Sequence, residues 1–401
     1  MERERRRAVS ANQPLAAAPD MNARKIERAV QIIFAGSALH SKRLLSLSRA
    51  VVGAVYASQA GVANIGRALA AAYRLTPKHA IKQFDRLLSN RAIGQTLTWM
   101  SYLRYVIGQQ PKLVVALDWT DYADGTLHRI ALNLVTRHGR ATPLIWKTVT
   151  AKELTGRRNA HEDRLLRQFK SLMPSGVQQV IVLADRGFGD VALYEELVKD
   201  LGFDFVIRFR GCIAVRSPSG ETRMASEWVP SNGRALRVKR ARLTASRYEV
   251  VAVVVVKRAA MKEGWHLATS LNLPADQIVR LYGRRFTIEE NFRDEKDWRF
   301  GLGSRYVNIR RADRRDRLSL VLAIATVLLT LLGEAGEKLG LARSLRANTV
   351  KRRTHSLFRQ GREYLRGVFD RRIKSIERLL VTAFDQLVAR QPRAAVPMGV
   401  I

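Results

Sequence analysis

The stretch from Tyr282 to Lys296 contains four side chains that can bind phosphate or metal: Tyr282, Arg285, Glu289 and Lys296. The stretch has no proline and one glycine, and it mixes charged and apolar residues at helical spacing, so we expect one helix. At about 100° per residue, Arg285, Glu289 and Lys296 lie within roughly 60° of Tyr282. A carboxylate flanked by three phosphate-binding groups suits an enzyme that holds a metal against a phosphodiester. The alternative is a solvated helix face with ordinary salt bridges.

Two further carboxylates end predicted strands. Asp118 closes an apolar run within KLVVALDW, and Asp185 closes QQVIVLAD. Gly187 permits a tight turn just beyond the second aspartate. Either aspartate alone is more often an ordinary strand-end or turn acid. Together with Glu289 they predict three carboxylates at one end of one sheet, where hard cations such as Mg²⁺ find oxygen ligands.

The elements that must position these acids alternate between strand and helix patterns. Strands are expected at 112–119, 129–137 and 142–150, then a helix at 160–173, a strand at 178–185, a helix at 190–201 and a strand at 203–210. Leading strands joined by short turns, followed by crossover helices, imply an α/β fold with a mixed sheet and helices on its faces.

The regions around this core have other patterns. Residues 22–108 read as a series of helices in which helix-turn-helix recognition of DNA is plausible, although no recognition helix stands out; a helical cap without DNA contact is the alternative. Residues 211–262 are turn-rich and strongly β, which predicts a β-rich insertion. Pro274 opens the long helix, and basic amphipathic helices are expected at 349–367 and 370–390.

The charge of the chain predicts a polyanionic partner. Its 401 residues carry a formal net charge of +35, and 47% of them are hydrophobic, which excludes general disorder. Lys and Arg exceed Asp and Glu by 12 in residues 1–110, by 10 in 111–300 and by 13 in 301–401. The charge therefore belongs to the whole body of the protein, as expected for a nucleic-acid-binding protein. Ribosome-type and membrane-surface proteins are basic too, so charge alone does not choose among these classes.

The cellular compartment is predicted from cysteine usage and from apolar runs. Cys212 is the single cysteine, which excludes a disulfide framework and fits a reducing cytoplasm. The charged N-terminus has no apolar run after it, so no secretory signal is expected. The apolar stretch 318–332 is short for a bilayer and is interpreted as a buried core helix.

These motifs together carry a family resemblance. The long helix matches Y-x2-R-x3-E-x6-K without a gap, and it follows LDWTD and LADRGF. The chain resembles bacterial insertion-sequence transposases of the Asp-Asp-Glu (DDE) type, in the branch with the Tyr-Arg-Glu-Lys signature, insertion-sequence family four. The resemblance covers about residues 112–335 and implies a ribonuclease H-like catalytic domain with a β-rich insertion. Phe286 departs from the tryptophan that often follows the signature arginine, but it remains aromatic.

The resemblance also implies roles for the signature residues. Asp118, Asp185 and Glu289 would bind two Mg²⁺ ions, with Mn²⁺ as a substitute, and Tyr282, Arg285 and Lys296 would hold the transposon end. The implied activity is hydrolysis at the element end, in some relatives through a hairpin, and joining of the freed 3′-hydroxyl to target DNA. The implied partners are double-stranded DNA and a second copy of the chain on that DNA, in the cytoplasm of a bacterium and at its nucleoid.

The predicted domains follow from these patterns. They are a basic disordered arm at 1–20, a helical DNA-binding domain at 21–110, a ribonuclease H-like catalytic domain at 111–335 that contains the insertion, and a C-terminal helical region at 336–401 for dimerisation or DNA contact. Two other functions stay open: a catalytically silent DNA-binding relative that acts as a repressor or architectural factor, and another ribonuclease H-like nuclease such as a junction resolvase.

Overall fold

The structure is a computed structural model that describes residues 22–57, 59–94, 96–122, 125–136, 138–297, 299, 301–367 and 374–393. The predicted basic arm at 1–20 lies outside these residues. The chain divides into two compact units, and the long helix α11 (Ala312–Lys338) contributes to both. Among the described residues, the first unit comprises those of 22–33, 40–90 and 324–389, and the second comprises those of 34–39, 91–323 and 390–393. The predicted domain boundaries remain predictions, because compactness and function are different criteria.

The first unit is helical and holds most of residues 22–108, for which a series of helices is predicted; the last helix of that series, residues 96–107, lies in the second unit. Its N-terminal helices are α1 (Ala23–Ile33), α2 (Ser41–Tyr56), α3 (Val62–Tyr73) and α4 (Pro77–Ser89). Its C-terminal helices are α12 (Leu357–Leu365) and α13 (Lys374–Arg390), beside the second half of α11. Glycine allows α11 and α12 to approach closely, because a Cβ at Gly333 would collide with the carbonyl oxygen of Leu357.

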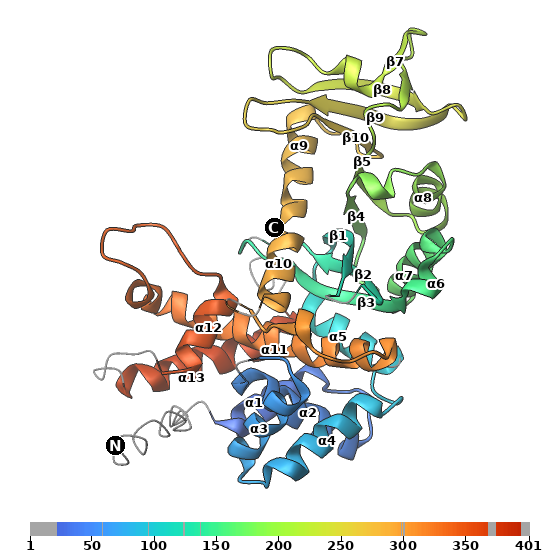
Figure 1. The fold of residues 1–401 in the computed structure, drawn as a ribbon. Coiled ribbons are helices and arrows are strands. Elements are labelled where there is room, and N and C mark those ends of the chain that lie inside the picture. The colour runs from blue at the N-terminus through green and yellow to red at the C-terminus, as the bar shows by residue number, and fades with distance from the viewer. Residues whose placement is uncertain are drawn as a thin grey trace, which may run out of the picture. The chain divides into compact units, whose positions relative to one another are not determined.

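The second unit is built on a ten-stranded sheet (Figure 1) in the order β3-β2-β1-β4-β5-β10-β9-β8-β6-β7. The strands are β1 (Lys112–Asp121), β2 (Leu127–Leu134), β3 (Thr142–Thr150), β4 (Gln179–Ala184), β5 (Asp204–Arg208), β6 (Ala214–Arg216), β7 (Thr222–Met224), β8 (Leu236–Leu243), β9 (Tyr248–Val256) and β10 (Trp265–Thr269). The pairs β1·β4 and β4·β5 are parallel and the other pairs are antiparallel. The predicted mixed α/β sheet is therefore confirmed.

The strands of the predicted β-rich insertion extend this sheet. β10 returns beside β5, and β9, β8, β6 and β7 then follow it in order. Three consecutive residues of β9, Val253, Val254 and Val255, are fully buried. Because successive side chains of a strand point to opposite faces, both faces of β9 are covered along this run. Residues 211–262 are thus rich in β-strands, as predicted, and their strands continue the sheet beyond β5 and β10.

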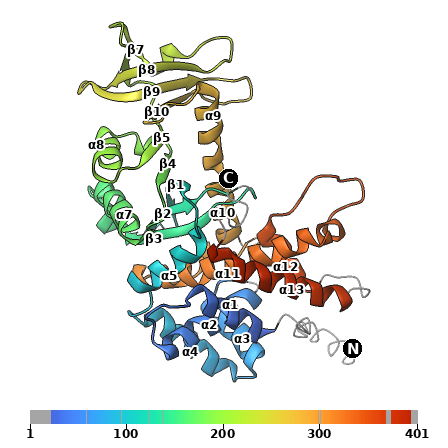
Figure 2. The same cartoon turned by 180° about the vertical axis from the view of Figure 1, so that it is seen from behind.

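Helices lie on both sides of the sheet. Figures 1 and 2 show α7 (Arg158–Leu172) and α8 (Val191–Glu195) on one side, and α9 (Ala275–Gly283) and α10 (Thr287–Lys296) on the other. This unit also contains α5 (Thr96–Ile107), the short α6 (Ala151–Leu154) and the first part of α11. Burial of leucine, valine and isoleucine side chains between these layers supplies the core.

The helix predicted from Tyr282 to Lys296 is interrupted, so that prediction is wrong in detail. Tyr282 lies near the end of α9, Arg284–Phe286 form a 3₁₀ turn, and α10 begins only at Thr287. A 3₁₀ turn has fewer residues per turn than an α-helix, so side chains before and after it no longer share one stripe. Tyr282 and Arg285 are instead buried, whereas the Glu289 side chain is about half exposed.

α11 is the one helix of the described residues that is long and apolar enough to cross a membrane. However, 89% of its most apolar part is buried within the protein. Burial of this kind is what a core helix shows, in agreement with the interpretation of residues 318–332.

Candidate active site

Asp118 and Asp185 lie next to each other on two parallel strands. Leu117 of β1 pairs with Ala184 of β4, and each aspartate is the next residue along the chain. Neighbouring strands are about 4.8 Å apart, so the two carboxylates are close to each other at the same end of the parallel strands. Asp185 also caps the following 3₁₀ turn, where its Oδ1 accepts a hydrogen bond of 2.8 Å from the Gly187 N–H.

Arg285 links Glu289 to Asp118 at this end of the strands. The Arg285 Nη2 donates a 2.8 Å hydrogen bond to Glu289 Oε1, and its Nη1 lies 3.7 Å from Asp118 Oδ2. The guanidinium is therefore shared by one acid of the sheet and one acid of α10. The structure brings all three predicted acids to one edge, with the cation of Arg285 between two of them.

Burial and neighbouring charges set the pKa of Asp118. Burial raises this pKa from 3.8 to about 6; Arg285 opposes the increase, while Asp185 and Glu289 add to it. For Arg285, burial acts to lower the pKa, but Tyr282, Asp118 and Glu289 outweigh it and the pKa lies above its ordinary value. The site thus concentrates negative charge and holds one cation firmly.

Tyr282 is buried behind Arg285. Its ring meets the ring of Trp265 edge to face with centroids 4.9 Å apart, and burial raises its pKa. Arg285 lies 5.1 Å from the centroid of Phe286, so the aromatic residue at the departing signature position also contacts the guanidinium. These contacts orient Arg285 toward the acids.

Lys296 is anchored to the end of β1. Its Nζ donates a hydrogen bond to the Thr120 hydroxyl and another of 2.8 Å to the Asp121 carbonyl oxygen. Burial, followed by repulsion from Arg129, lowers the pKa of Lys296 to about 8. The ammonium is therefore fixed by the strand itself, at the residues that follow Asp118 along β1.

The donor set can be tested against a divalent metal. Carboxylate oxygens are the ligands that Mg²⁺ prefers, and here they already hold one cation, the guanidinium of Arg285. Yet among the residues that the structure describes, no three Asp, Glu, His or Cys side chains are spaced to hold a metal ion. The acids are therefore of the right chemical type for Mg²⁺. In this conformation, however, Asp118 and Glu289 are spaced to hold the guanidinium of Arg285 between them.

A second ionic network, which no pattern in the sequence predicts, anchors α10 to the sheet. Arg129 of β2 donates two 2.7 Å hydrogen bonds to the two oxygens of Glu295, and both side chains are buried. Arg140 donates a 2.8 Å hydrogen bond to Asp294 and lies 3.3 Å from Glu290.

These partners are far apart along the chain, by 166 positions for Arg129 and Glu295 and by 154 for Arg140 and Asp294, and such separations leave no local signal. The Arg285–Glu289 pair differs, because its spacing of four residues is the usual one for an ion pair on a helix. That pair could have been found from the sequence.

Comparison with known proteins finds a family match for the middle of the chain. Residues 131–328 match the family described as the transposase DDE domain, which supports a DDE transposase. The matched residues include Asp185, Glu289 and the signature residues around Glu289, while Asp118 precedes them. No curated protein matches the chain.

Proposed function

We propose, on the premise that residues 131–328 form a transposase DDE domain, that this protein is a DNA transposase. It binds insertion-sequence ends, cuts phosphodiester bonds there and joins the 3′-hydroxyl ends to target DNA. The single observation that carries the proposal is the convergence of Asp118, Asp185 and Glu289 around one edge of the sheet and one guanidinium. Membership of the Tyr-Arg-Glu-Lys branch is part of the same proposal.

The catalytic core is proposed to be ribonuclease H-like. The strand order β3-β2-β1-β4-β5, with β2 antiparallel to β1 and β4 parallel to it, supports this assignment. Asp118, Asp185 and Glu289 are the proposed ligands of two Mg²⁺ ions, which Mn²⁺ can replace. When bound, such ions activate a water and stabilise the leaving oxygen of a phosphodiester.

The protein's own side chains supply charge and position. Arg285 contacts Asp118, and Lys296 is held at the end of the same strand. These positions support a role for both cations in holding an incoming phosphate. Tyr282 supports Arg285 through ring contact and is the third proposed contact to the transposon end. The acids alone would repel DNA, so these cations are required for a phosphodiester to approach.

The helical unit offers a surface for reading the DNA ends. A short turn joins α3 to α4, and a Cβ at Gly66 of α3 would lie 2.5 Å from the Ile81 Cα of α4, so the two helices cross closely. On α4, exposed side chains with hydrogen-bonding groups follow helical spacing: Lys78, His79, Lys82 and Arg86. We propose α4 as the recognition helix of a helix-turn-helix, since these side chains suit base edges and phosphates in a major groove.

The proposed reaction sets the partners and compartment. Transposition joins two ends, so a homodimer on double-stranded DNA is proposed, in the cytoplasm of a bacterium where nucleoid DNA is accessible. The C-terminal helices are a further candidate for dimerisation or DNA contact.

The test is cleavage of DNA taken from the two flanks of the gene of this protein, where the proposed function requires terminal inverted repeats. With Mg²⁺ or Mn²⁺ the full chain should nick such DNA at the repeat boundary. Asp118→Asn, Asp185→Asn and Glu289→Gln should each abolish nicking while end binding in a gel-shift assay persists. Glu290→Gln is the matched control, because Glu290 is the next residue of α10 but pairs with Arg140 and Arg293.

The outcomes separate the three functions. Cutting by all three acid variants at the wild-type rate would refute the site. Specific binding without cutting in either metal would instead favour the silent DNA-binding relative, and cutting of branched DNA regardless of end sequence would favour a junction nuclease.

A further inference from the structure

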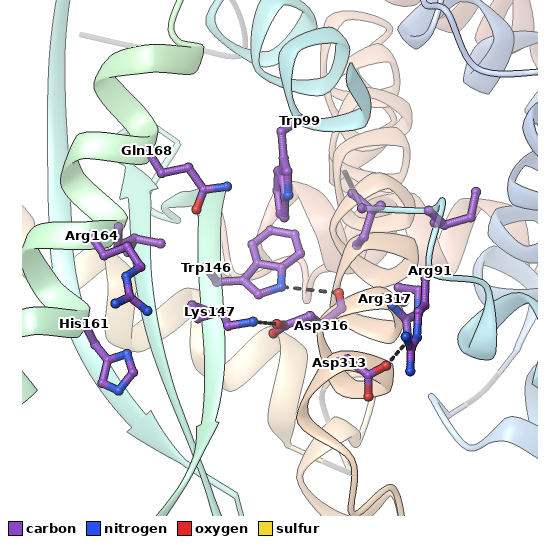
Figure 3. Close-up of a pocket in the computed structure, with 14 residues that line it drawn as sticks. Arg91, Trp99, Trp146, Lys147, His161, Arg164, Gln168, Asp313, Asp316 and Arg317 are labelled. Carbon is purple, nitrogen blue, oxygen red and sulfur yellow. Dashed lines mark hydrogen bonds and ion pairs between the residues drawn. The ribbon is translucent and has the colours of Figure 1, made fainter. Parts of the chain in front are cut away.

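A cavity at the β3 edge of the sheet has no role in the proposed reaction. It measures about 380 Å³ and lies among α5, β3, α7 and the first half of α11 (Figure 3). β3 is the terminal strand of the sheet. Trp146 of β3 pairs with Ala131, which pairs with Asp118, so two strand spacings, roughly 10 Å, separate the backbone of Trp146 from that of Asp118. No residue that lines the cavity belongs to the acid site, so the two are separate sites in the same unit.

The floor of the cavity is apolar and aromatic. Trp146 and Trp99 meet edge to face with centroids 4.6 Å apart. The Trp146 Nε1–H donates to the Asp316 carbonyl oxygen at 3.3 Å, so the polar atom of this ring is already satisfied. Leu165 and Leu320 complete the floor. These four side chains are largely buried, so what they offer a ligand is a small area of carbon surface.

The rim of the cavity carries a surplus of positive charge. The two acids on it are neutralised locally: Asp313 accepts a hydrogen bond from Arg317, and Asp316 lies 3.7 Å from the Lys147 ammonium. Within the part of the chain that the structure describes, neither Arg91 nor Arg164 has an ion-pair or hydrogen-bond partner for its guanidinium. The two arginines face the cavity from opposite sides in Figure 3.

We propose that this cavity binds an unpaired nucleic-acid strand, with a base or sugar on the Trp146 floor and flanking phosphates at Arg164 and Arg91. A strand alternates rings and phosphates, which matches an apolar floor between two separated cations. In a duplex the flat faces of the bases are covered by stacking, so only an unpaired strand can present a base to the floor. The volume lies in the range of pockets that bind small organic groups.

The chemistry disfavours simpler ligands. An isolated inorganic anion needs convergent cations, whereas the two free guanidinium groups lie on opposite sides of the cavity. A mononucleotide can fill the floor but reaches only one side. A short oligonucleotide satisfies both, so it should bind more tightly than either. Only the identification of the strand as DNA rests on the proposed transposase function.

The test is photo-crosslinking of the full chain to a short DNA strand, about four nucleotides long, that carries one iodinated base, at about 150 mM salt to limit non-specific binding. We expect crosslinked peptides from β3, α7 or the segment around Trp99. Replacing both free arginines, Arg91→Gln with Arg164→Gln, should lower the yield at these peptides about tenfold. The matched control, Lys112→Gln with Lys170→Gln, removes two exposed charges of the same unit outside the cavity and should change the yield by less than about twofold.

A second variant tests the floor without altering charge. Gln168 lines the cavity from the exposed face of α7, and Gln168→Trp should fill it and block crosslinking, while thermal unfolding confirms that each variant is folded. Crosslinks confined to other peptides would overturn the proposal. So would a yield that the arginine pair does not affect, or inorganic phosphate competing as strongly as the oligonucleotide. End cleavage is measured separately, so failure here leaves the proposed transposase activity untouched.

Discussion

At the scale of single residues, Arg285 is the cation that two of the three acids share. Its guanidinium lies between Asp118 and Glu289, with contacts of 3.7 and 2.8 Å. Under the proposed function, a divalent ion and this guanidinium compete for the same carboxylate oxygens. Loading of metal then requires Arg285 to leave at least one acid, and a DNA phosphate near the site is a suitable new partner for it.

The raised pKa of Asp118 means that its charged form lowers the stability of the folded protein. Its pKa is about 6 in the folded protein, above the ordinary 3.8. Protonated Asp118 therefore contributes its full share to the free energy of unfolding below about pH 4, and this contribution is lost as the pH rises through 6. At about pH 8 the charged group should cost about 3 kcal/mol relative to a neutral one. We therefore expect Asp118→Asn to raise the free energy of unfolding by up to that amount while abolishing end cleavage.

Denaturant unfolding at several pH values measures this effect. The gain from Asp118→Asn should fall to about half near pH 5 and become small at about pH 4, following the linkage. Asp121→Asn is the control, because its side chain is 68% exposed and its pairing with His128 is a surface interaction. A gain that does not depend on pH would contradict the burial of a charged carboxylate at Asp118.

At the scale of elements, α10 positions Glu289 through contacts on its other faces. The buried Arg129–Glu295 pair ties the helix to β2, and the Arg140–Asp294 pair ties it to the turn after β2. Because one partner left alone in a buried pair keeps an uncompensated charge, we expect Glu295→Gln to lower the free energy of unfolding by about 3 kcal/mol. End cleavage should fall as well, since α10 then holds Glu289 less firmly.

The control for this helix is Glu290→Gln, whose ion pairs with Arg140 and Arg293 are more exposed. It should cost at most about 1 kcal/mol and leave cleavage near the wild-type rate. Equal losses for the two variants in urea unfolding would mean that the buried pair has no special part in holding α10.

Close packing of α3 on α4 gives a second prediction at this scale. A Cβ at Gly66 would lie 2.5 Å from the Ile81 Cα, so Gly66→Ala must push the helices apart and should cost about 1–3 kcal/mol. Duplex DNA binding measured by fluorescence anisotropy should weaken with it if α4 reads DNA. Gly176→Ala, where the added Cβ meets nothing within 4 Å, should change neither stability nor binding. Unchanged binding by a destabilised Gly66→Ala protein would argue against α4.

Local structure is predicted well from this sequence, and long-range structure poorly. The strand end at Asp185 is predictable because an apolar run followed by an acid is a local signal. The strand end expected at Asp118 is wrong, since β1 continues to Asp121. The 3₁₀ turn at Arg284–Phe286 is not, since no proline marks it and it depends on contacts such as that of Tyr282 with Trp265.

The Arg129–Glu295 pair spans 166 residues and is visible only in the folded protein. The ionic anchoring of α10 therefore lies beyond any reading of neighbouring residues. The roles of Asp118, Asp185 and Glu289 stay predictions that the cleavage experiment tests.

At the scale of the whole molecule, charge governs association. The net charge of +35 is spread over all parts of the chain, so two free copies repel one another. Duplex DNA neutralises Lys and Arg side chains and releases counterions, which removes much of that repulsion and makes the binding strongly dependent on salt. Under the proposed function, we therefore expect a dimer to assemble only on DNA, which would keep two copies from pairing before each has bound a transposon end.

We therefore expect the protein to sediment at low salt as a monomer, with the 45.2 kDa mass of one chain, and to form a complex of two protomers when DNA with two repeat ends is added. Analytical ultracentrifugation measures both states. Raising the salt without DNA screens the repulsion, so any weak dimer should grow rather than shrink. DNA of equal length without the repeats is the control, and it should bind single protomers without a defined two-protomer complex. A stable dimer at low salt in the absence of DNA would show that a specific interface overcomes the charge, and that DNA is not what brings the copies together.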